Sequence, residues 1–533
     1  MFHFKKEEKL YSIAVIFWIT LLFATHIIWT SLNKSSFSWD QSIHASHTLE
    51  AKKNVYNLFN LEKTEAISSY YPPGFYYMSA FLLIFLDTTE FNLRMVSFFF
   101  YLANIVTFLV IIKQKKYEGN IFTVIALFCI YSLLPGNILF SRDYLLDLPQ
   151  TTILSLGYLF LILYIKNKRI KFYIFMLLFF LFSLLVKWTS IVFIVIPFFI
   201  LARSAFQNSK NNLERIKIIL ISVFLSGVVL TPWYSRNFLT LFSLAKNFSR
   251  AEITDPQSIF SLENIFYYPV HFTNEILGLP LSIFFAASFI YSLYYKVKPF
   301  FLLHFFLTYF VFTFLISNKD SRYLLPILPV VVLFVAMTAL KLNKNLQKLL
   351  FILTFIYYLI LNLVIFDKNE IVKINLNIPI LDNKSIEIFS TNLISQWKPN
   401  ENKSTFYYVN NLFINQCKNS CYVLLAADLA EVNIFSFDYL NSISDSHITY
   451  SDYAFFKNTT EKKWHSYLNL FKYVIIPSKL VATEESQDLK LLLEIKNRIT
   501  TNNCFEKIGQ AKVNNNNELL LYKKNYILCA KIE

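Results

Sequence analysis

The chain has few cysteines and few glycines. Only five cysteines occur in 533 residues, and the four in the last third of the chain are Cys417, Cys421, Cys504 and Cys529. They lack the two-residue gap and the following histidine pair that are typical of a zinc site. In an oxidising compartment, Cys417–Cys421 and Cys504–Cys529 are candidate disulfides, although spacing alone does not fix the pairing. With only seven glycines and much Lys, Asn, Ile and Phe, the whole chain has a biased composition, so single Phe or Asn residues carry little weight.

Two further features are absent. The first apolar run, Tyr11 to Thr30, is not followed by the small-residue cleavage site of a secretory signal, so we expect it to remain as a signal anchor. The chain also shows no internal repeat, whereas transporters commonly consist of related halves.

Long apolar runs dominate the first two-thirds of the chain. The composition is 55% hydrophobic and 18% aromatic, and many runs approach the ~20 residues that a helix needs to cross a bilayer. The sequence therefore predicts a polytopic α-helical membrane protein with about eleven spans: 11–30, 93–112, 121–140, 151–165, 172–186, 191–201, 216–233, 276–295, 299–317, 323–340 and 349–366.

Charge orients these spans, because cytoplasmic loops are enriched in Lys and Arg. The segments assigned to the inside hold nineteen basic and four acidic residues, the outward loops up to Phe366 hold twelve and thirteen, and the remainder holds nineteen and eighteen. The whole formal charge of +15 therefore falls on one face. Membrane topology accounts for the basic balance, and no nucleic acid partner is needed. We expect a plasma (inner) membrane protein with a cytoplasmic N-terminus.

The sequence predicts two domains. Residues 1–366 form the multi-span module, with long outer loops at 31–92 and 234–275. The apolar stretch Phe75 to Leu86 in the first loop has only twelve residues, which is too short to span a bilayer. For residues 367–533 the pattern predicts an extracytoplasmic α/β or α+β domain. Strand-like runs are predicted at 405–410, 421–426, 472–477 and 518–523, and an amphipathic stretch at 488–499.

Acidic and basic residues gather at the predicted outer ends of the spans. Such a face can hold an anionic, lipid-linked substrate, since a carboxylate can accept a proton from an incoming hydroxyl or amine and a cation can stabilise a phosphate leaving group. The candidate catalytic residues are Asp40, Asp147 and Asp143. The candidate substrate-binding residues are Arg94, Arg142, Lys187, Trp233, Tyr234, Arg236, Arg322 and Tyr323.

Asp40, His44 and His47 would share one face of a helix, because they follow the spacing i, i+4 and i+7. That face is compatible with a divalent metal ion bound by His44 and His47. A plain polar helix face explains the same spacing, since no complete ligand set is visible. No cofactor is required by the sequence.

Several segments together resemble the GT-C glycosyltransferases, in particular the branch of the protein mannosyltransferases and lipid A aminoarabinose transferases. They are the acid after the first span, Tyr71-Pro72-Pro73-Gly74, Arg142 to Pro149, Lys187-Trp188, Pro232-Trp233-Tyr234, and Arg322 to Pro329. No single motif is specific. Their order and their common side of the membrane, from about Tyr11 to Leu340, carry the resemblance.

The resemblance implies an inverting membrane glycosyltransferase that uses a polyprenyl-phosphate sugar as its donor. A hexosyl or pentosyl group would pass to a lipid, glycan or protein acceptor on the extracytoplasmic face, among membrane lipids. By the same resemblance, Asp40 matches the first-loop acid of the family, which is the expected base or acceptor-orienting group. Asp147 matches the acid before the fourth span, which is expected to help form the active site. Arg322 and Tyr323 match a pair near the lipid phosphate.

The chain also departs from the family's pattern. Gln41 follows Asp40, where many relatives have a second acid, so we expect Asp40 to act alone or with Asp143 or Asp147. Tyr71 stands where the aminoarabinose transferases have a lysine, which argues against aminoarabinose as the donor sugar. The competing hypothesis is a transporter or flippase of a lipid-linked glycan, which many spans and buried charges would also suit.

Overall fold

A computed structural model describes most of the chain, and its residues fall into two compact units. The first unit comprises 1–30, 51–85 and 91–398, and the second comprises 31–50, 86–90 and 399–533. The described residues are 6–54, 68, 70–114, 121–208, 212–248, 259–316, 318–363, 375–377, 385–387, 405–417, 421–427, 433–444, 448–456, 468, 470–479, 486–501, 504–514 and 517–525.

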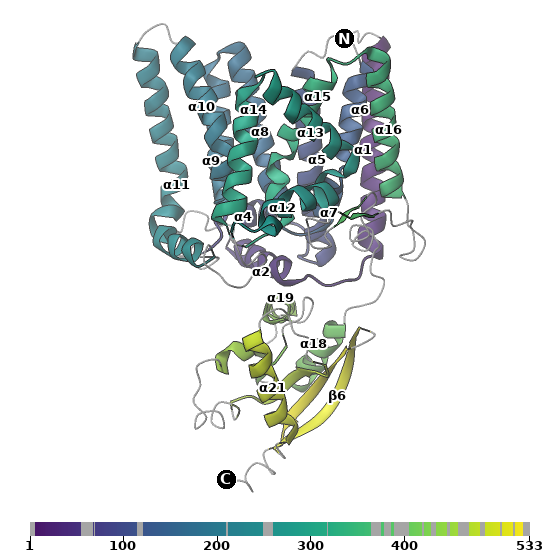
Figure 1. Cartoon of the computed structure of the whole chain (residues 1–533). Helices are drawn as coiled ribbons and strands as arrows, with labels where there is room; N and C mark the ends of the chain where they lie inside the picture. Colours follow the sequence, from purple (N-terminus) through teal and green to yellow (C-terminus); the bar gives the residue numbers. More distant parts are fainter. Residues whose placement is uncertain are drawn as a thin grey trace. The chain divides into compact units, whose positions relative to one another are not determined.

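Each of the eleven predicted spans overlaps an apolar helix of the first unit (Figure 1). Within the described residues, six candidates are long enough to cross a membrane, and they lie at Tyr11–Leu32, Glu90–Gln114, Asp147–Asn167, Arg215–Ser243, Ser321–Ala339 and Lys344–Asn362. They belong to α1 (Lys6–Leu32), α5 (Glu90–Gln114), α8 (Asp147–Asn167), α11 (Asn212–Phe248), η4 (Ser321–Ile327) with α15 (Leu328–Ala339), and α16 (Lys344–Leu363).

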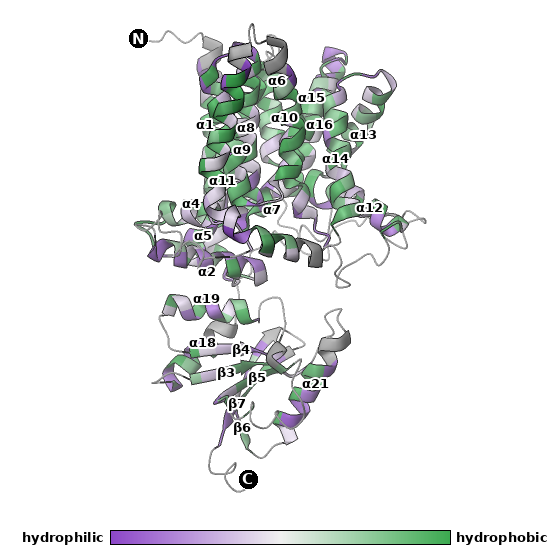
Figure 2. Ribbon diagram, turned by 90° about the vertical axis from the view of Figure 1, so that its left-hand side faces the viewer, coloured by the Kyte–Doolittle hydropathy of each residue, from purple (hydrophilic) through white to green (hydrophobic). Residues whose placement is uncertain are grey.

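The other five predicted spans fall on shorter or bent helices. α6 (Ile121–Ser132) and α7 (Pro135–Arg142) pass the same test only as a pair, bent by 49°. The remaining four are α9 (Ile170–Val186), α10 (Ser190–Asn208), α13 (Leu279–Tyr294), and α14 (Pro299–Phe310) with the π-helix η3 (Val311–Leu315). The colouring in Figure 2 shows that α9, α10, α13 and α14 are mainly hydrophobic. The chain is a polytopic membrane protein, as the sequence predicted.

Two segments that the sequence placed in long loops between the spans are helical. The apolar stretch after Pro73 forms α4 (Gly74–Leu82), a helix of nine residues that is too short to cross a membrane. Helix α11 does not end at Trp233, where the sequence placed the end of a span, but continues through Pro232 to Phe248. The helix tolerates Pro232 because neighbouring groups can satisfy the backbone carbonyl that a proline leaves without a donor.

Gly278 joins the π-helix η2 (Phe272–Leu277), which continues α12 (Leu262–His271), to α13. Its φ of 80° lies in the left-handed region that favours glycine. A Cβ atom at this position would lie 2.9 Å from the Cε1 atom of Tyr358. The hydroxyl of Tyr358 donates to the carbonyl of Leu277, so this ring cannot move aside without losing a buried hydrogen bond.

We therefore expect Gly278→Ala to lower the stability of the protein by about 1–3 kcal/mol. The measurement is the thermal unfolding of the detergent-solubilised chain. Gly227→Ala is the matched control, since a Cβ there meets nothing within 4 Å and alanine favours a helix more than glycine does. Equal unfolding temperatures for the two variants would contradict the assignment of strain to Gly278.

The second unit contains a five-stranded mixed sheet with the strand order β4-β3-β5-β7-β6. β3 (Cys421–Leu425) pairs in parallel with β4 (Ile448–Asp452) and β5 (Tyr473–Pro477), while β7 (Asn517–Lys524) pairs antiparallel with β5 and with β6 (Phe505–Asn514). One face of the sheet packs on α18 (Thr405–Gln416) and α19 (Ile434–Ser444), and the other packs on α21 (Ser486–Thr501). The domain is therefore α/β in character.

Three of the four predicted strand runs form strands, and the amphipathic stretch 488–499 lies in α21. The prediction for 405–410 was wrong, because these residues begin helix α18. β-branched and aromatic side chains favour a strand over so short a window, but Val409 and Phe413 are both fully buried at the spacing of one helical turn.

Cys417 and Cys421 form a disulfide, which is one of the two pairings that the sequence suggested. Cys529 lies outside the described residues, so the pairing of Cys504 with Cys529 stays a prediction.

Candidate functional site

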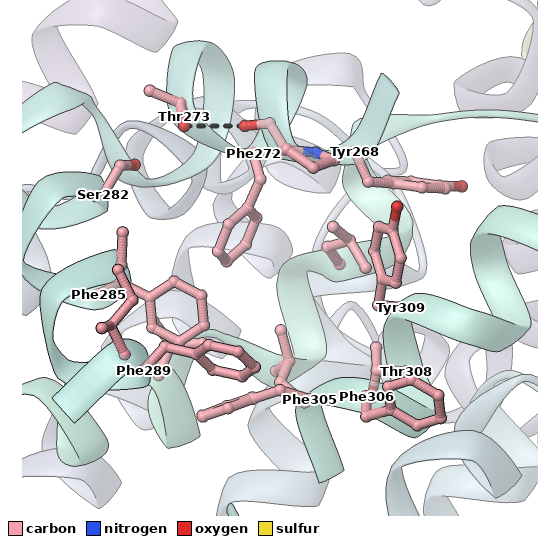
Figure 3. Close-up of a pocket in the computed structure, with 16 residues that line it drawn as sticks. Tyr268, Phe272, Thr273, Ser282, Phe285, Phe289, Phe305, Phe306, Thr308 and Tyr309 are labelled. Carbon is pink, nitrogen blue, oxygen red and sulfur yellow. Dashed lines mark hydrogen bonds between the residues drawn. The ribbon is translucent and has the colours of Figure 1, made fainter. Parts of the chain in front are cut away.

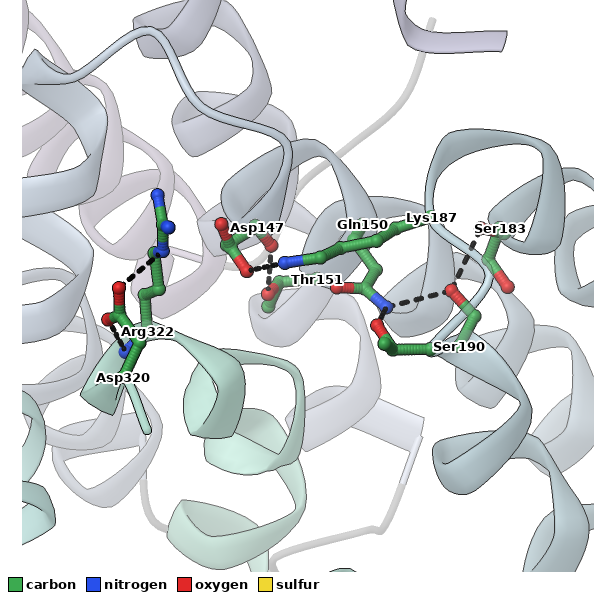
Figure 4. Close-up of polar contacts among 9 residues, drawn as sticks. Asp147, Gln150, Thr151, Ser183, Lys187, Ser190, Asp320 and Arg322 are labelled. Atoms are coloured by element: carbon green, nitrogen blue, oxygen red, sulfur yellow. Dashed lines mark hydrogen bonds and ion pairs between the residues drawn. The ribbon is translucent and has the colours of Figure 1, made fainter. Parts of the chain in front are cut away.

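The centre of the candidate site in the first unit is a buried ion pair between Lys187 and Asp147. The Nζ atom of Lys187 lies 2.6 Å from Oδ1 of Asp147, and the two side chains are 8% and 2% exposed (Figure 4). Asp147 is the first residue of α8, where the positive end of the helix dipole stabilises a carboxylate. Lys187 follows the last residue of α9 in an extended conformation. Sequence analysis selected both residues, and the structure pairs them.

Hydrogen bonds hold the backbone on either side of this ion pair. Gln150, one helical turn after Asp147, donates from Nε2 to the hydroxyls of Thr189 at 3.2 Å and Ser190 at 2.9 Å. The hydroxyl of Ser190 donates in turn to the carbonyl of Ser183 at 2.8 Å, near the end of α9. The ends of α8, α9 and α10 are thereby tied together around Lys187 (Figure 4).

A second ion pair lies beside the first. Nε of Arg322 is 2.7 Å from Oδ2 of Asp320, whose other oxygen, Oδ1, accepts the backbone N–H of Arg322 at 3.0 Å and so caps η4. Burial raises the pKa of the Asp320 carboxyl, and Arg322 opposes that shift; the charges of Asp147 and Lys187 also act on it. The two ion pairs are therefore electrostatic neighbours, and α8 packs on η4.

Tyr323 joins this cluster from η4. Its ring centroid lies 4.6 Å from Nζ of Lys187, which is a cation–π contact. Both residues line a small cavity of about 60 Å³, together with Tyr70, Tyr71, Trp188 and Asn318 among others. Two cations, two carboxylates and several aromatic rings thus share one region of the first unit.

Lys319 is a third cation at the same loop. Its ammonium group donates to the carbonyls of Phe312 at 2.6 Å and Thr313 at 2.7 Å, and also to that of Ile316, all at the end of η3. Burial lowers the pKa of Lys319 to about 8. Nζ also lies 5.7 Å from the ring centroid of Tyr268.

Tyr268 belongs to the wall of a large apolar cavity of about 410 Å³ (Figure 3). Helices α12, η2, α13, α14, η4 and α15 contribute its lining, which includes Phe272, Phe285, Phe289, Phe305 and Leu324. The 3-10 helix η4 therefore carries Arg322 in its first turn and contributes Leu324 to this wall two residues later. A ligand with a charged head and an apolar chain would match this charged region and the apolar cavity next to it.

Arg94 and Arg142 form a separate group of basic candidates. Arg94 donates from Nη1 to the carbonyl of Arg142 at 3.1 Å, and both guanidinium groups lie over the ring of Trp29, at 5.8 Å and 4.7 Å. Asp143 is the C-cap of α7 and follows its last residue, Arg142, in an extended conformation.

Three substrate-binding candidates, Trp233, Tyr234 and Arg236, lie on α11. Trp233 donates from Nε1 to the carbonyl of Ser68 at 3.3 Å, and Tyr234 donates to the carbonyl of Leu184 at 2.7 Å. The second contact holds α11 against the end of α9, three residues before Lys187. Arg236 is exposed on the same helix.

Asp40, His44 and His47 lie in the second unit, on α2 (Trp39–Lys53). The stretch is helical, so the three residues share a face, as the spacing suggested. His44 is buried, and Asp40 and His47 are half-buried. Burial lowers the pKa of His47 to about 4. No group of three or more His, Cys, Asp or Glu in the described part of the chain could hold a metal ion, so the metal site at His44 and His47 stays a prediction.

Three titratable groups near the site, Lys319, Asp320 and Glu275, were not among the predicted site residues. Asp320 lay within a charged loop and was not selected, although an acid two residues before Arg322 could have been recognised as a helix cap. Glu275 accepts from Nδ1 of His271 at 2.8 Å. Burial raises the pKa of Glu275, but hydrogen bonds from His271 and Ser321 outweigh it and lower the pKa overall. No sequence motif marks this pair.

The chain shares its fold with a solved membrane enzyme. ArnT from Cupriavidus metallidurans, a lipid A aminoarabinose transferase, matches in the apo state with a TM-score of 0.59 and 11% identity, covering 96% of this chain and 98% of that chain. The same protein bound to undecaprenyl phosphate matches with a TM-score of 0.55 and 10% identity over the same shares. The archaeal oligosaccharyltransferase AglB from Archaeoglobus fulgidus, in complex with an inhibitory peptide and a dolichol-phosphate, has a TM-score of 0.49 at 9% identity, covering 86% of this chain and 69% of that chain, and is too remote to support an argument.

No protein-family model matches the chain, and no curated protein matches it. At identities near 10% the likeness concerns the fold and not the individual residues. It extends over nearly the full length of both chains. The chain therefore has the GT-C fold of membrane transferases such as ArnT, as its sequence resemblance predicted.

Proposed function

We propose that this protein is a membrane glycosyltransferase that transfers a sugar from a polyprenyl-phosphate donor to a lipid, glycan or protein acceptor. The proposal rests on the two neighbouring ion pairs, Lys187–Asp147 and Asp320–Arg322, beside a large apolar cavity. The shared fold with ArnT, which has been solved with undecaprenyl phosphate, supports the same donor class.

The donor fits these surfaces by its chemistry. A phosphate carries negative charge and would lie near Lys187 and Arg322, whose counter-ions Asp147 and Asp320 hold them in position. The isoprenoid chain is apolar and would occupy the cavity that continues from η4 between α13 and α14. Burying the cations in a low-dielectric region strengthens their attraction for the phosphate.

The reaction forms one bond and breaks one. An acceptor oxygen or nitrogen attacks the anomeric carbon with inversion, and the bond from that carbon to the phosphate oxygen breaks. The electron pair stays on the released polyprenyl phosphate, where Lys187 and Arg322 would stabilise it. The acceptor's proton passes to a carboxylate, for which we propose Asp40.

We further propose that transfer takes place on the extracytoplasmic side of a plasma membrane, with the N-terminus cytoplasmic. The distribution of charge favours this orientation, since nineteen of the basic residues and only four acids fall in the alternate loops assigned to the cytoplasm.

The test is to supply the purified protein with a panel of polyprenyl-phosphate hexoses and pentoses and to measure the release of polyprenyl phosphate. We expect release from at least one donor, and we expect the aminoarabinose donor to be used poorly because Tyr71 replaces the lysine of that branch. The proposal would be contradicted if no donor of the panel released polyprenyl phosphate, even with lipid, glycan and peptide acceptors present.

Arg322→Ala should raise the KM for the lipid-linked donor about 10- to 100-fold, as expected for the loss of a charge-assisted contact to a phosphate. Steady-state kinetics with increasing donor give this value, and thermal unfolding monitors the fold. Arg498→Ala is the matched control, because Arg498 also pairs with an acid, Glu494 at 2.9 Å, but on the surface of the C-terminal domain. A similar change in KM for both variants would argue against a phosphate contact at Arg322.

A further inference from the structure

The C-terminal domain and the first outer loop form one compact unit. Residues 31–50 and 86–90 cluster with residues 399–533 and not with the membrane helices that flank them in sequence. Helix α2 begins in this loop at Trp39 and carries Asp40 in its first turn. The domain therefore contacts the segment that holds the proposed base.

The contact centres on Phe37, two residues before α2. Its carbonyl accepts hydrogen bonds from the hydroxyl of Ser42 in α2, at 2.9 Å, and from the hydroxyl of Ser436 in α19, at 3.2 Å. The two hydroxyl oxygens are 3.3 Å apart. Phe37, Ser42 and Ser436 are all 0% exposed, so water does not compete for these bonds.

Tyr439 makes a second contact one turn further along α19. Its ring packs on that of Phe37 with centroids 5.6 Å apart, and its hydroxyl donates to the carbonyl of Thr88 at 3.1 Å. The backbone N–H of Phe37 donates to Oε1 of Glu90 at 3.4 Å. Helix α19 thus joins both ends of the first outer region, residues 31–50 and 86–90.

Helix α19 is itself fixed in the domain. Asn433 accepts the backbone N–H of Ser436 at 3.1 Å, as an N-cap residue does. Phe437 and Leu440 pack into the core beneath the sheet. The position of Ser436 and Tyr439 is therefore set by the folded C-terminal domain and not by the loop that they contact.

We infer that the C-terminal domain acts as a positioning element, in which Ser436 and Tyr439 of α19 fix the first turn of α2 and so orient Asp40. This inference rests on the proposed function, because it assigns its effect to Asp40. Asp40 lies between Phe37 and Ser42, the two residues that α19 secures, so a shift of this turn moves the carboxylate directly. A displacement of ~1 Å at a catalytic group can lower a rate ~100-fold.

The test compares Ser436→Ala, Tyr439→Phe and the double variant in the full-length protein. We expect kcat to fall about 10-fold in each single variant and about 100-fold in the double variant, while the KM for the donor stays within about twofold. Amide hydrogen exchange should become faster in residues 39–45 of α2 and stay unchanged in β3 and β5.

Tyr450→Phe is the matched control. It removes a buried hydroxyl from the same domain, which donates to Oδ1 of Asn410 in α18 at 2.6 Å. If this variant lowers kcat as much as Tyr439→Phe does, or if exchange in α2 does not change in the double variant, the positioning role is wrong. Full activity of Asp40→Asn would instead overturn the assignment of the base, while the exchange measurement would still report on the docking of α2.

Discussion

Asp147→Asn is expected to lose sugar transfer and about 3–5 kcal/mol of stability, because it leaves the buried ammonium of Lys187 without its counter-ion. Lys187→Met should have a comparable effect by leaving the carboxylate of Asp147 buried alone. Thermal unfolding and the rate of polyprenyl phosphate release measure the two losses separately. Glu494→Gln, which breaks an exposed ion pair, should change stability by less than about 1 kcal/mol.

The double variant Asp147→Asn/Lys187→Met separates structure from function. Replacing both members of a buried ion pair by neutral residues is often nearly neutral for stability. We therefore expect the double variant to regain most of the lost stability and to remain inactive, since the cation that would stabilise the leaving phosphate is missing. A double variant that is both stable and active would exclude this ion pair from the active site.

Asp40→Asn is expected to lower kcat about 10²- to 10⁴-fold, which is the usual contribution of a general base. The fold should be little affected, because Asp40 is only half-buried and asparagine also suits the start of a helix. The measurement is kcat at saturating donor, with the unfolding temperature as a check. Glu50→Gln, on the same helix, is the control and should keep full activity. Unchanged turnover in Asp40→Asn would require another base.

The membrane part of the fold could be predicted from the sequence because the bilayer imposes a simple rule. Runs of apolar residues near the length of a span mark the helices, and all eleven predicted runs overlap apolar helices. Charge counts add an orientation. The rule says little about where helices break, so the bend between α6 and α7 and the continuation of α11 through Pro232 were not foreseen.

The candidate site was predicted only in part. Asp147 and Lys187 were both selected, but their pairing across forty positions depends on how α8 and α9 pack, which no local pattern encodes. Asp320 was overlooked because a charged loop residue looks solvated in the sequence, whereas the structure leaves it half-buried and paired with Arg322. The link from α19 to α2 joins residues about 400 positions apart and could not be read from either segment alone.

The C-terminal domain illustrates the limit of short windows. The run 405–410 has the side chains of a strand and forms a helix, because Val409 and Phe413 fill one face of a core that only the assembled sheet creates. The runs at 421–426, 472–477 and 518–523 were predicted correctly, since their largely buried strands lie in the middle of the sheet, where apolar residues are required on both faces.

We propose that this protein cleaves a lipid-linked sugar and does not merely move it across the membrane. The most direct measurement places the purified chain in proteoliposomes with a polyprenyl-phosphate sugar labelled in both the sugar and the carrier, and follows the fate of each label. We predict that the sugar label appears on the acceptor while the carrier label is recovered as polyprenyl phosphate, and that Asp147→Asn/Lys187→Met abolishes both. Intact donor reaching the opposite leaflet with both labels still joined would contradict the transferase and support a flippase.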